Sequence, residues 1–139
     1  MKSEFSTSWI GSSQPRKQRK YRINAPLHLK REFLISNLSK ELRKKHGQRN
    51  LLIRKGDEVL VMRGSFKKKK AKVLEVDMKR TRVVLEGITR NKRDGTKVPV
   101  FFNPSKIQIV TLNVDDRKRL KSLRNQHKEE KHAPNKSTN

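Results

Sequence analysis

Short apolar runs separated by turn-forming residues fill the middle of the chain. Runs of about four to eight residues that alternate apolar and polar positions are typical of β-strands with one buried face. The pattern predicts five strands: roughly Glu58–Met62, Ala71–Asp77, Thr81–Glu86, Lys97–Phe102 and Ile107–Thr111. Five short antiparallel strands in so short a segment predict a mainly β fold, a small and strongly bent barrel whose closure removes exposed sheet edges.

Turn signals separate the predicted strands. Met78-Lys79-Arg80 predicts a tight connection, and Asp94-Gly95 supplies the positive φ of a hairpin turn. Asn103-Pro104-Ser105-Lys106 predicts a single helical turn before the last strand. Because proline cannot donate a hydrogen bond to a neighbouring strand, Pro99 predicts an edge strand or a bulge.

Helical patterns precede the strands. Leu27 to about Ile35 is a first helical segment, which Ser36-Asn37 interrupts. A second helix is predicted from Ser39 as the N-cap to Gly47 as the C-terminal stop, with Glu41 in its first turn. The apolar side of these helices is expected to cover the barrel, and it consists of Phe33, Leu34, Leu38 and Leu42.

A densely cationic hairpin tip lies between the first two predicted strands. The turn Arg63-Gly64-Ser65 is followed by four consecutive lysines, Lys67 to Lys70. A rigid sheet can hold such a cluster against a polyanion, whereas a disordered lysine run attracts one only loosely. The hairpin is therefore a candidate binding surface.

The composition indicates an anionic partner. Lysine and arginine number 37 against 13 aspartates and glutamates, which gives a formal net charge of +24 over 139 residues. The phosphates of nucleic acid are the first candidate for that partner. An anionic membrane is weaker as a candidate, because the sequence has no long apolar run and no basic amphipathic helix with aromatic residues on one side.

The size of the core and the cellular compartment also follow from composition. With 31% hydrophobic and 5% aromatic residues, the chain is expected to bury one small core. Cysteine is absent, which excludes disulfides and thiolate chemistry and fits a reducing compartment. Residues 1–14 lack the apolar run of a signal peptide, so we expect a soluble intracellular protein.

The N-terminal residues are predicted to extend from this core. Residues 1–14 are expected to be a flexible leader, in which Trp9 stacks on a base, fills a pocket on a partner or belongs to a loosely ordered terminus. Pro15 to Arg22 places five positive residues in eight. This segment is either an arm laid along phosphates or a solvated charge run, and Tyr21 with the Asn24-Ala25-Pro26 turn favours the arm.

The C-terminal residues are predicted to form a short helix and a tail. Asp115 and Asp116 precede Leu120 and Leu123 at helical spacing, which fits an N-cap with an acidic first turn better than a metal-binding pair. From Gln126 onward the sequence suits a flexible tail. The expected division is a leader (1–14), a basic arm with short helices that pack on the barrel (15–50), the barrel (51–112), and the helix with its basic tail (113–139).

Signals for catalysis are missing from the sequence. His28 and His46 lack the carboxylate or second histidine that a metal site or acid–base pair needs, and no glycine-rich loop that cradles phosphates is present. We therefore expect no metal, no cofactor and no enzymatic activity. Both histidines are expected at the surface, and His28 is the better placed to reach RNA.

The strands and the hairpin between them resemble a KOW motif, which lies on an SH3-like barrel. The motif is carried by Ile53-Arg54-Lys55-Gly56-Asp57-Glu58-Val59, Val61-Met62-Arg63-Gly64-Ser65-Phe66-Lys67 and Lys72-Val73-Leu74-Glu75-Val76. The flanking matches are Asn24-Ala25-Pro26-Leu27-His28, Leu38-Ser39-Lys40-Glu41-Leu42-Arg43, Asp94-Gly95-Thr96 and Pro104-Ser105-Lys106-Ile107. Over about Pro15 to Arg119, the chain resembles the archaeal and eukaryotic type of the universal KOW-domain family of the large ribosomal subunit.

The resemblance implies a function and a set of partners. It implies a structural protein that binds the 5′ region of the large ribosomal RNA, supports early subunit assembly and lies near the exit of the peptide tunnel. Neighbouring large-subunit proteins are then expected as partners, with the chain a monomer in the ribosome, no membrane insertion and no small-molecule substrate. A KOW-type transcription or RNA-processing factor is the alternative, although such factors usually carry a second folded domain.

The expected RNA-binding residues combine the hairpin, the arm and basic positions on the folded unit. By the resemblance, Arg63 to Lys67 form the RNA-facing loop, Lys55 and Gly56 support the turn into the first strand, and the arm threads between RNA helices. The full set is Arg16, Lys17, Arg19, Lys20, Tyr21, Arg22, Asn24, His28, Lys30, Arg31, Lys55, Arg63, Gly64, Ser65, Phe66, Lys67, Lys68, Lys69, Lys70, Lys72, Lys79, Arg80 and Lys106.

The hairpin departs from the family pattern at two positions. The family often has glycine where this chain has Lys68, and the characteristic glycine of the KOW motif corresponds to Ala71. Alanine enters the positive-φ region less easily than glycine. Either the backbone is in an ordinary β conformation there, or the loop has shifted and lysine contacts to phosphate replace a close backbone approach.

Overall fold

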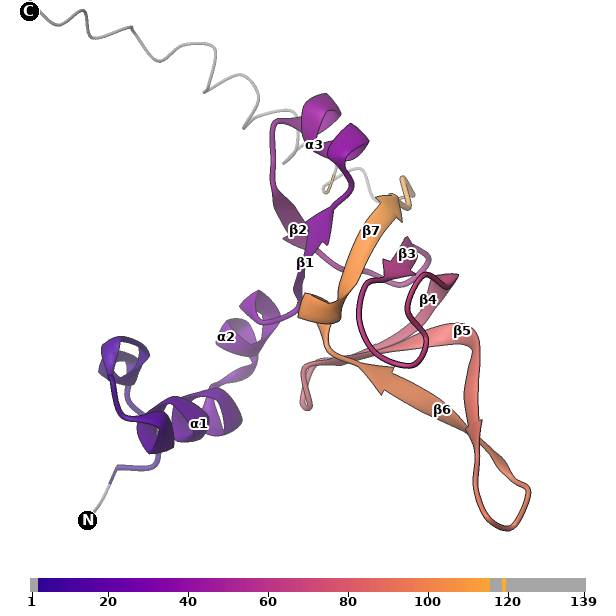
Figure 1. Cartoon of the computed structure of the whole chain (residues 1–139). Helices are drawn as coiled ribbons and strands as arrows, with labels where there is room; N and C mark the ends of the chain where they lie inside the picture. The colour runs from indigo at the N-terminus through magenta and orange to yellow at the C-terminus, as the bar shows by residue number, and fades with distance from the viewer. Residues whose placement is uncertain (1–2, 116–118, 120–139) are drawn as a thin grey trace, which may run out of the picture.

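The computed structural model describes residues 3–115 and Arg119, and these residues form a mainly β fold (Figure 1). The helices are the 3-10 helix η1 (Thr7–Gly11), α1 (Pro15–Asn24), α2 (Leu27–Glu32), α3 (Lys40–His46) and the 3-10 helix η2 (Pro104–Lys106). The strands are β1 (Ile35–Leu38), β2 (Asn50–Leu52), β3 (Glu58–Val61), β4 (Lys70–Asp77), β5 (Arg82–Asn91), β6 (Lys97–Phe102) and β7 (Ile107–Thr111).

All five predicted strands are present, as β3 to β7. The bounds of β6 and β7 match the prediction, and β5 runs on to Asn91. The predicted helical turn is also confirmed as η2, where the Asn103 side chain accepts a hydrogen bond from the Ser105 backbone N–H. The turn-forming residues between the strands therefore indicated correctly that this half of the chain divides into five strands.

The sheet is larger than the expected five-stranded barrel. Seven strands pair in the order β2-β1-β7-β3-β4-β5-β6, with β1 parallel to β7 and every other pair antiparallel. Among the described residues the strand pairings start at β2 and end at β6, so they do not form a closed five-stranded ring. Because β6 is an edge strand, the prediction for Pro99 is confirmed.

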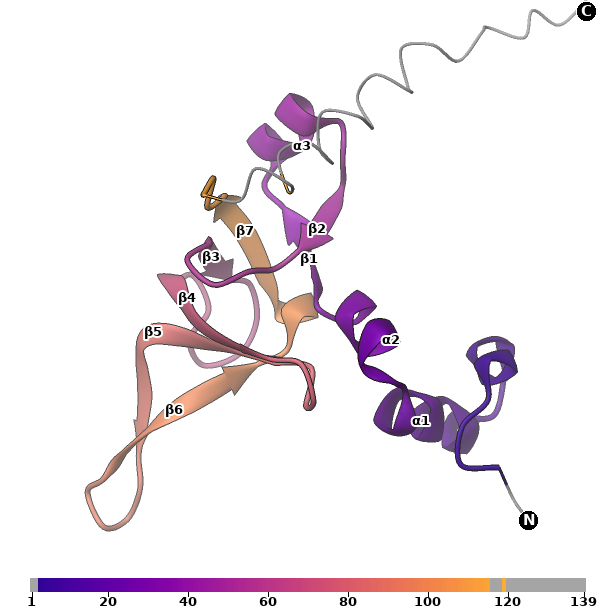
Figure 2. The same cartoon turned by 180° about the vertical axis from the view of Figure 1, so that it is seen from behind.

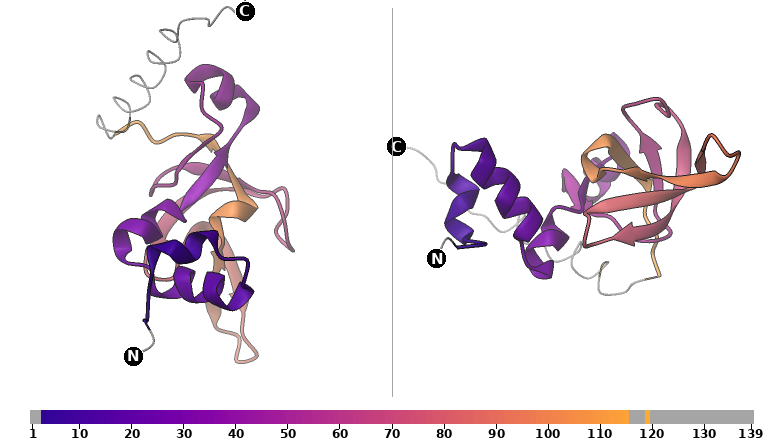
Figure 3. Two further views of the ribbon diagram at one scale, coloured as in Figure 1. Left: turned by 90° about the vertical axis from the view of Figure 1, so that its left-hand side faces the viewer. Right: turned by 90° about the horizontal axis from the view of Figure 1, so that it is seen from below.

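The sheet bends around one core. Register shifts occur within β4, between Val73 and Glu75, and within β5, between Val84 and Thr89, where Gly87 has a φ of 71°. Such irregularities increase the local twist and bend a strand. Figure 3 shows the strands curving round each other when the molecule is seen from below. The core shares residues from both ends of the sheet: Leu34, Leu38, Ile53, Val59, Val61, Val73, Val83, Leu85, Ile88, Phe102, Ile107 and Ile109.

Of the two added strands, β1 comes from a segment that was expected to be helical or to interrupt helices, and β2 comes from residues for which no element was predicted. The predicted helix ends at Glu32, and Ser36 and Asn37 belong to β1. Buried Ser36 fits there because its hydroxyl lies 3.0 Å from the Pro104 carbonyl oxygen and 2.7 Å from that of Ile107. The expectation that Leu38 covers the barrel from a helix was wrong, since it lies in a strand paired with β7.

Helix α3 confirms the capping prediction. The Ser39 hydroxyl accepts a hydrogen bond from the Leu42 backbone N–H at 3.3 Å, and Gly47 ends the helix with a φ of 68°. Glu41 lies in the first turn, near the positive end of the helix dipole. The last turn is basic and lies at the negative end, so both ends carry the charge that stabilises the helix. These signals act within one or two turns, which explains why the sequence reveals them.

The predicted N-terminal arm is a helix, α1, and the leader folds against it. The Gln18 amide nitrogen lies 2.8 Å from the carbonyl oxygens of both Ile10 and Ser12. The Phe5 ring stacks on Tyr21 at 5.3 Å between centroids, and Tyr21 meets the edge of Phe33 at 6.0 Å. These contacts hold the leader, α1 and the end of α2 together, and α1 and α2 project from the sheet (Figure 2).

The predicted C-terminal helix and tail fall largely outside the described residues. Asp116, Leu120, Leu123 and the tail from Gln126 are among the positions that the structure does not describe. Asp115 is exposed, and its backbone N–H donates to the Asn113 side chain at 3.0 Å.

Candidate nucleic-acid interface

The loop between β3 and β4 holds the lysine cluster on a backbone that is bonded to itself. The Lys68 N–H donates to the Val61 carbonyl oxygen at 2.8 Å, and the Lys67 N–H donates to that of Gly64 at 3.0 Å. In return, the Val61 N–H donates to the Lys69 carbonyl oxygen at 2.9 Å. The four lysine side chains from Lys67 to Lys70 are all exposed, so their charges face solvent from a fixed loop.

The structure decides between the two alternatives for this loop. Ala71 lies in β4 opposite Val59, in ordinary extended backbone. The positive φ occurs instead at Lys68, where it is 70°. This is the left-handed region that glycine enters without steric cost and lysine does not. The loop therefore has its left-handed residue at Lys68 and not at Ala71.

Phe66 fixes the loop to the core. Its ring meets the edge of Phe102 at 6.1 Å between centroids, and the Lys69 ammonium lies 5.4 Å from the Phe66 centroid. Phe66 is half-buried in this arrangement. It therefore positions Arg63 to Ser65 beside the edge strand β6.

A hollow of about 740 Å³ opens between this loop, η2 and the β5–β6 ribbon. Arg63, Arg82, Arg90 and Lys106 bring four positive charges to it. Phe101, which is 40% exposed, adds an aromatic surface on which a base could stack. The loop, sheet and 3-10 helix thus contribute to one basic concavity.

A second hollow, of about 710 Å³, adjoins the first. It lies between the ends of α1 and α2 and the β4–β5 turn, and Arg82 and Asn103 line both hollows. Its cations are Arg22, Lys30, Lys79, Arg80 and Arg82. We call the two joined hollows the basic groove.

The basic groove has a uniform electrostatic character. Eight lysines and arginines line it, and none of the described residues that line it is acidic. Arg80 is near a carboxylate, but its Nε lies 3.9 Å from Asp77 Oδ2 at an exposed position, where such a pair is weak. Clefts lined by one sign of charge concentrate the field, which suits a backbone of phosphates.

Nine expected RNA-binding residues lie together in this groove. They are Arg22, Lys30, Arg63, Gly64, Ser65, Phe66, Lys79, Arg80 and Lys106. Sequence reasoning missed Arg82 and Arg90 as contributors. The sequence did contain a signal for Arg90. A hairpin turn at Asp94-Gly95 implies that the residues before it pair with β6, and in the structure Arg90 pairs with Val98.

The expected residues of α1 divide between its surface and its contacts with the leader. Arg16, Lys17 and Arg19 are exposed. The Lys20 ammonium donates to the Ser3 carbonyl oxygen at 2.9 Å, and the Asn24 amide donates to that of Glu4 at 2.8 Å. Tyr21 is buried, so in this structure its ring supports α1 and is not available to stack on a base.

The remaining expected residues lie outside the basic groove. Lys72 is exposed on β4, directly opposite Glu58. Exposed His28 lines a different hollow, beside β2. Arg31 lies beside it, and both Arg31 and Lys55 line a further hollow whose floor is apolar.

No group of three or more His, Cys, Asp or Glu side chains among the described residues is arranged to hold a metal ion. None of the helices in the same residues is long and apolar enough to span a membrane.

Comparison with known proteins shows which proteins this chain is similar to. The sequence model of a family described as ribosomal proteins L26 in eukaryotes and L24 in archaea matches residues 12–126. Large ribosomal subunit protein uL24 of Nanoarchaeum equitans (strain Kin4-M) is 47% identical over 122 residues, which cover 88% of this chain and 82% of that protein. The uL24 protein of Korarchaeum cryptofilum (strain OPF8) is 47% identical over 113 residues, covering 80% and 86% respectively.

Proposed function

The chain belongs to the family of eukaryotic L26 and archaeal L24 ribosomal proteins, and we propose that it is a structural constituent of the large ribosomal subunit that binds ribosomal RNA through the basic groove. The family is not enzymatic. As part of a ribosome the protein acts in the cytoplasm. The observation that carries the proposal is the joining of two hollows through Arg82 into one surface with eight cations.

The mechanism is phosphate neutralisation on a preformed surface. Exposed cations release counterions from RNA when they pair with its phosphates, and the bent sheet holds them in fixed relative positions. RNA helices are recognised mainly by shape and by backbone contacts, which a long basic groove can provide. Lys67 to Lys70 and the exposed side of α1 add charge on either side of the groove.

The bent sheet is the scaffold of this surface, and we take β3 to β7 to correspond to an SH3-like barrel of the KOW type. The shared core of these strands and the two register shifts support that assignment. In this scheme residues 51–112 are the barrel. Residues 15–50 supply α1, α2, β1 and α3, and β2 spans the boundary between the two segments; β1 and β2 extend the sheet.

The site of action is proposed from the family alone. Members of this kind are expected to bind the 5′ region of the large ribosomal RNA, to support early subunit assembly and to lie near the exit of the peptide tunnel, among neighbouring proteins. The two helices α1 and α2 that project from the sheet supply reach for such a role (Figure 1).

Sedimentation tests the proposed function. Tagged protein in cell extract should be recovered in stoichiometric amounts with the large subunit after the subunits are separated. Recovery with RNA polymerase instead would favour a KOW-type transcription factor and overturn the proposal.

A further inference from the structure

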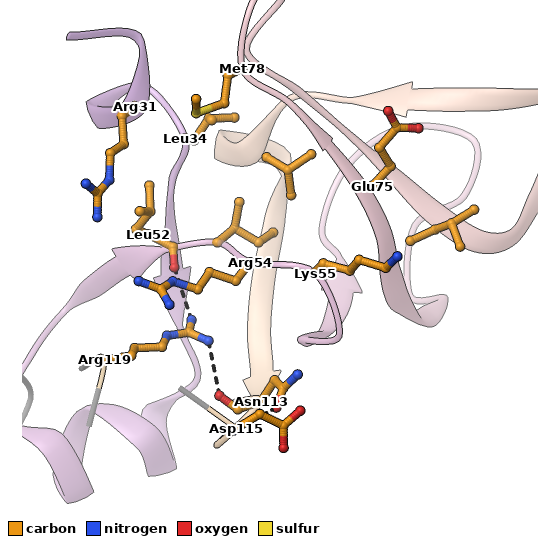
Figure 4. A pocket seen from close by; sticks show the side chains of 13 residues that line it. Arg31, Leu34, Leu52, Arg54, Lys55, Glu75, Met78, Asn113, Asp115 and Arg119 are labelled. Carbon is orange, nitrogen blue, oxygen red and sulfur yellow. Dashed lines mark hydrogen bonds between the residues drawn. The ribbon is translucent and has the colours of Figure 1, made fainter. Parts of the chain in front are cut away.

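A hollow with an apolar floor lies apart from the basic groove. It has a volume of about 760 Å³, and its floor is built from the ends of β2 and β4 and from the residues before β1 (Figure 4). The apolar side chains are Leu34, Leu52, Ile53, Leu74, Val76 and Met78. Two of them are notably accessible, since Leu74 is 51% exposed and Met78 is 42% exposed.

Leu74 reaches this hollow because of the irregularity in β4. Val73 pairs with Leu85 and Glu75 pairs with Val84, which leaves Leu74 as the extra residue of a bulge. A bulge changes the direction in which a side chain points. Leu74 and Glu75 are consequently both exposed, although successive strand residues normally point to opposite faces. The fold thus places a leucine on the surface of a highly charged protein.

The rim of the hollow differs from the basic groove in its charges. Its lining cations are Arg31, Arg54, Lys55 and Arg119, of which Arg119 is buried in its ion pair with Asp57. Unlike the basic groove, the hollow also carries two carboxylates, Glu75 and Asp115 (Figure 4). Within the described part of the chain, neither carboxylate forms an ion pair. Both side chains are exposed, so cations of a partner can reach them.

RNA and a second copy of the chain both fit this hollow poorly. The hollow suits phosphates less well than the basic groove does, because two carboxylates stand beside its cations. None of its described lining residues is aromatic, so bases have no ring on which to stack. A second copy carries another formal net charge of +24, so the two chains repel each other as a whole. Burial of Leu74 and Met78 against an apolar side chain of a different protein avoids both costs.

We propose that this hollow docks a segment of a neighbouring protein, which inserts an apolar side chain over Leu74 and Met78 and presents a lysine or arginine to Glu75 or Asp115. The inference rests on the proposed function. It extends that function by assigning the RNA and the protein partner to different surfaces of the chain. Acidic residues are outnumbered 13 to 37 by basic residues in this chain, and the two carboxylates on this apolar rim favour a cationic side chain in the partner segment.

Site-specific photo-crosslinking tests the docking. Because the chain has no cysteine, Met78→Cys introduces a unique thiol for benzophenone maleimide, and Leu74→Cys is the second variant should the first fold poorly. Ser65→Cys, in the basic groove, is the matched control. Each labelled protein is incorporated into large subunits in cells or by reconstitution, and its adducts are identified after irradiation.

The expected result is a nuclease-resistant adduct from position 78 to one ribosomal protein, at a peptide with an apolar residue beside lysine or arginine. Its yield should fall severalfold when Glu75→Gln and Asp115→Asn are added, while position 65 gives an RNA adduct throughout. An RNA adduct from position 78, an adduct to residues 120–139 of the same chain, or no adduct in assembled subunits would overturn the docking. Failure of every variant, and of the unsubstituted chain, to enter large subunits would overturn the proposed function and the docking with it.

Discussion

Arg119 forms a two-pronged ion pair with Asp57, although 62 residues separate them in the sequence. Arg119 Nη1 donates to Asp57 Oδ1 at 2.6 Å, and Nη2 donates to Oδ2 at 2.9 Å. The same carboxylate accepts hydrogen bonds from the backbone N–H groups of Arg54 and Asn113, each at 2.9 Å. Both side chains are almost completely buried, so this pair joins the entry of β3 to the segment after β7.

Substitution of Asp57→Asn should destabilise the fold strongly. The variant leaves the buried guanidinium of Arg119 without its counter-charge, and breaking a buried pair in this way costs about 3–5 kcal/mol. The free energy of unfolding in urea measures the loss, and Asp94→Asn, at an exposed turn, is the control. Adding Arg119→Met to Asp57→Asn should recover part of the stability. A loss no larger than that of the control would contradict the assigned role of the pair.

Gly56→Ala should destabilise the turn into β3. Gly56 has a φ of 86°, and a Cβ there would lie 2.5 Å from Asn113 Nδ2. An L-residue in the left-handed region costs roughly 1–2 kcal/mol before any rearrangement of Asn113. Thermal unfolding should show a lower midpoint than that of Gly11→Ala, because nothing lies within 4 Å of a Cβ at Gly11. Equal midpoints would show that the turn adapts without cost.

Lys68→Gly should stabilise the free protein slightly, by less than about 1 kcal/mol. The substitution removes the steric cost of a φ of 70°, partly offset by the greater freedom of glycine in the unfolded chain. Ala71→Gly is the matched comparison and should destabilise, because Ala71 lies within β4. Urea unfolding of the two variants would refute the loop geometry if their effects had the opposite signs.

Arg82→Gln should weaken RNA binding more than the same charge loss elsewhere. Arg82 lines both halves of the basic groove, whereas Lys44 is exposed on α3 away from it. Loss of one phosphate contact should lower the slope of log affinity against log salt by about 1. Binding to a large-subunit RNA fragment at several salt concentrations measures the slope, with Lys44→Gln as the control. Similar slopes for both variants would argue against the groove.

The tip of the β5–β6 hairpin should respond to acid. The Thr96 hydroxyl and then the Thr96 backbone N–H donate to the Asp94 carboxylate, and these bonds lower the pKa of Asp94 below its usual value. The bonds therefore stabilise the turn fully above the ordinary aspartate pKa, and the stabilisation is lost as pH falls through the lowered pKa. NMR titration of the Thr96 amide should report this lowered pKa. Thr96→Ala should move it back toward the ordinary value, and an unchanged pKa would contradict the assigned cause.

The candidate site was only partly predictable from the sequence. The charge of the hairpin loop was evident from Lys67 to Lys70, and the turns around it were predicted at the correct positions. The role of Arg82 depends on residues of α1 and α2, of the loop after β3 and of the segment after β6, which meet only in the folded chain. Conversely, Tyr21 stands in a basic run but is buried between Phe5 and Phe33.

The sequence by itself determined the features that arise from neighbouring residues. The caps of α3 at Ser39 and Gly47, the strands β6 and β7 and the turn at Asp94-Gly95 depend on backbone preferences and bonds that span a few residues. The tertiary structure alone decided the pairing of β1 with β7, the partnership of Asp57 with Arg119 and the separation of the basic groove from the apolar hollow. Those features bring together residues that are distant in the chain. Their contacts stabilise the protein only after the entropic cost of closing the long loops between them has been met, which happens when the core forms.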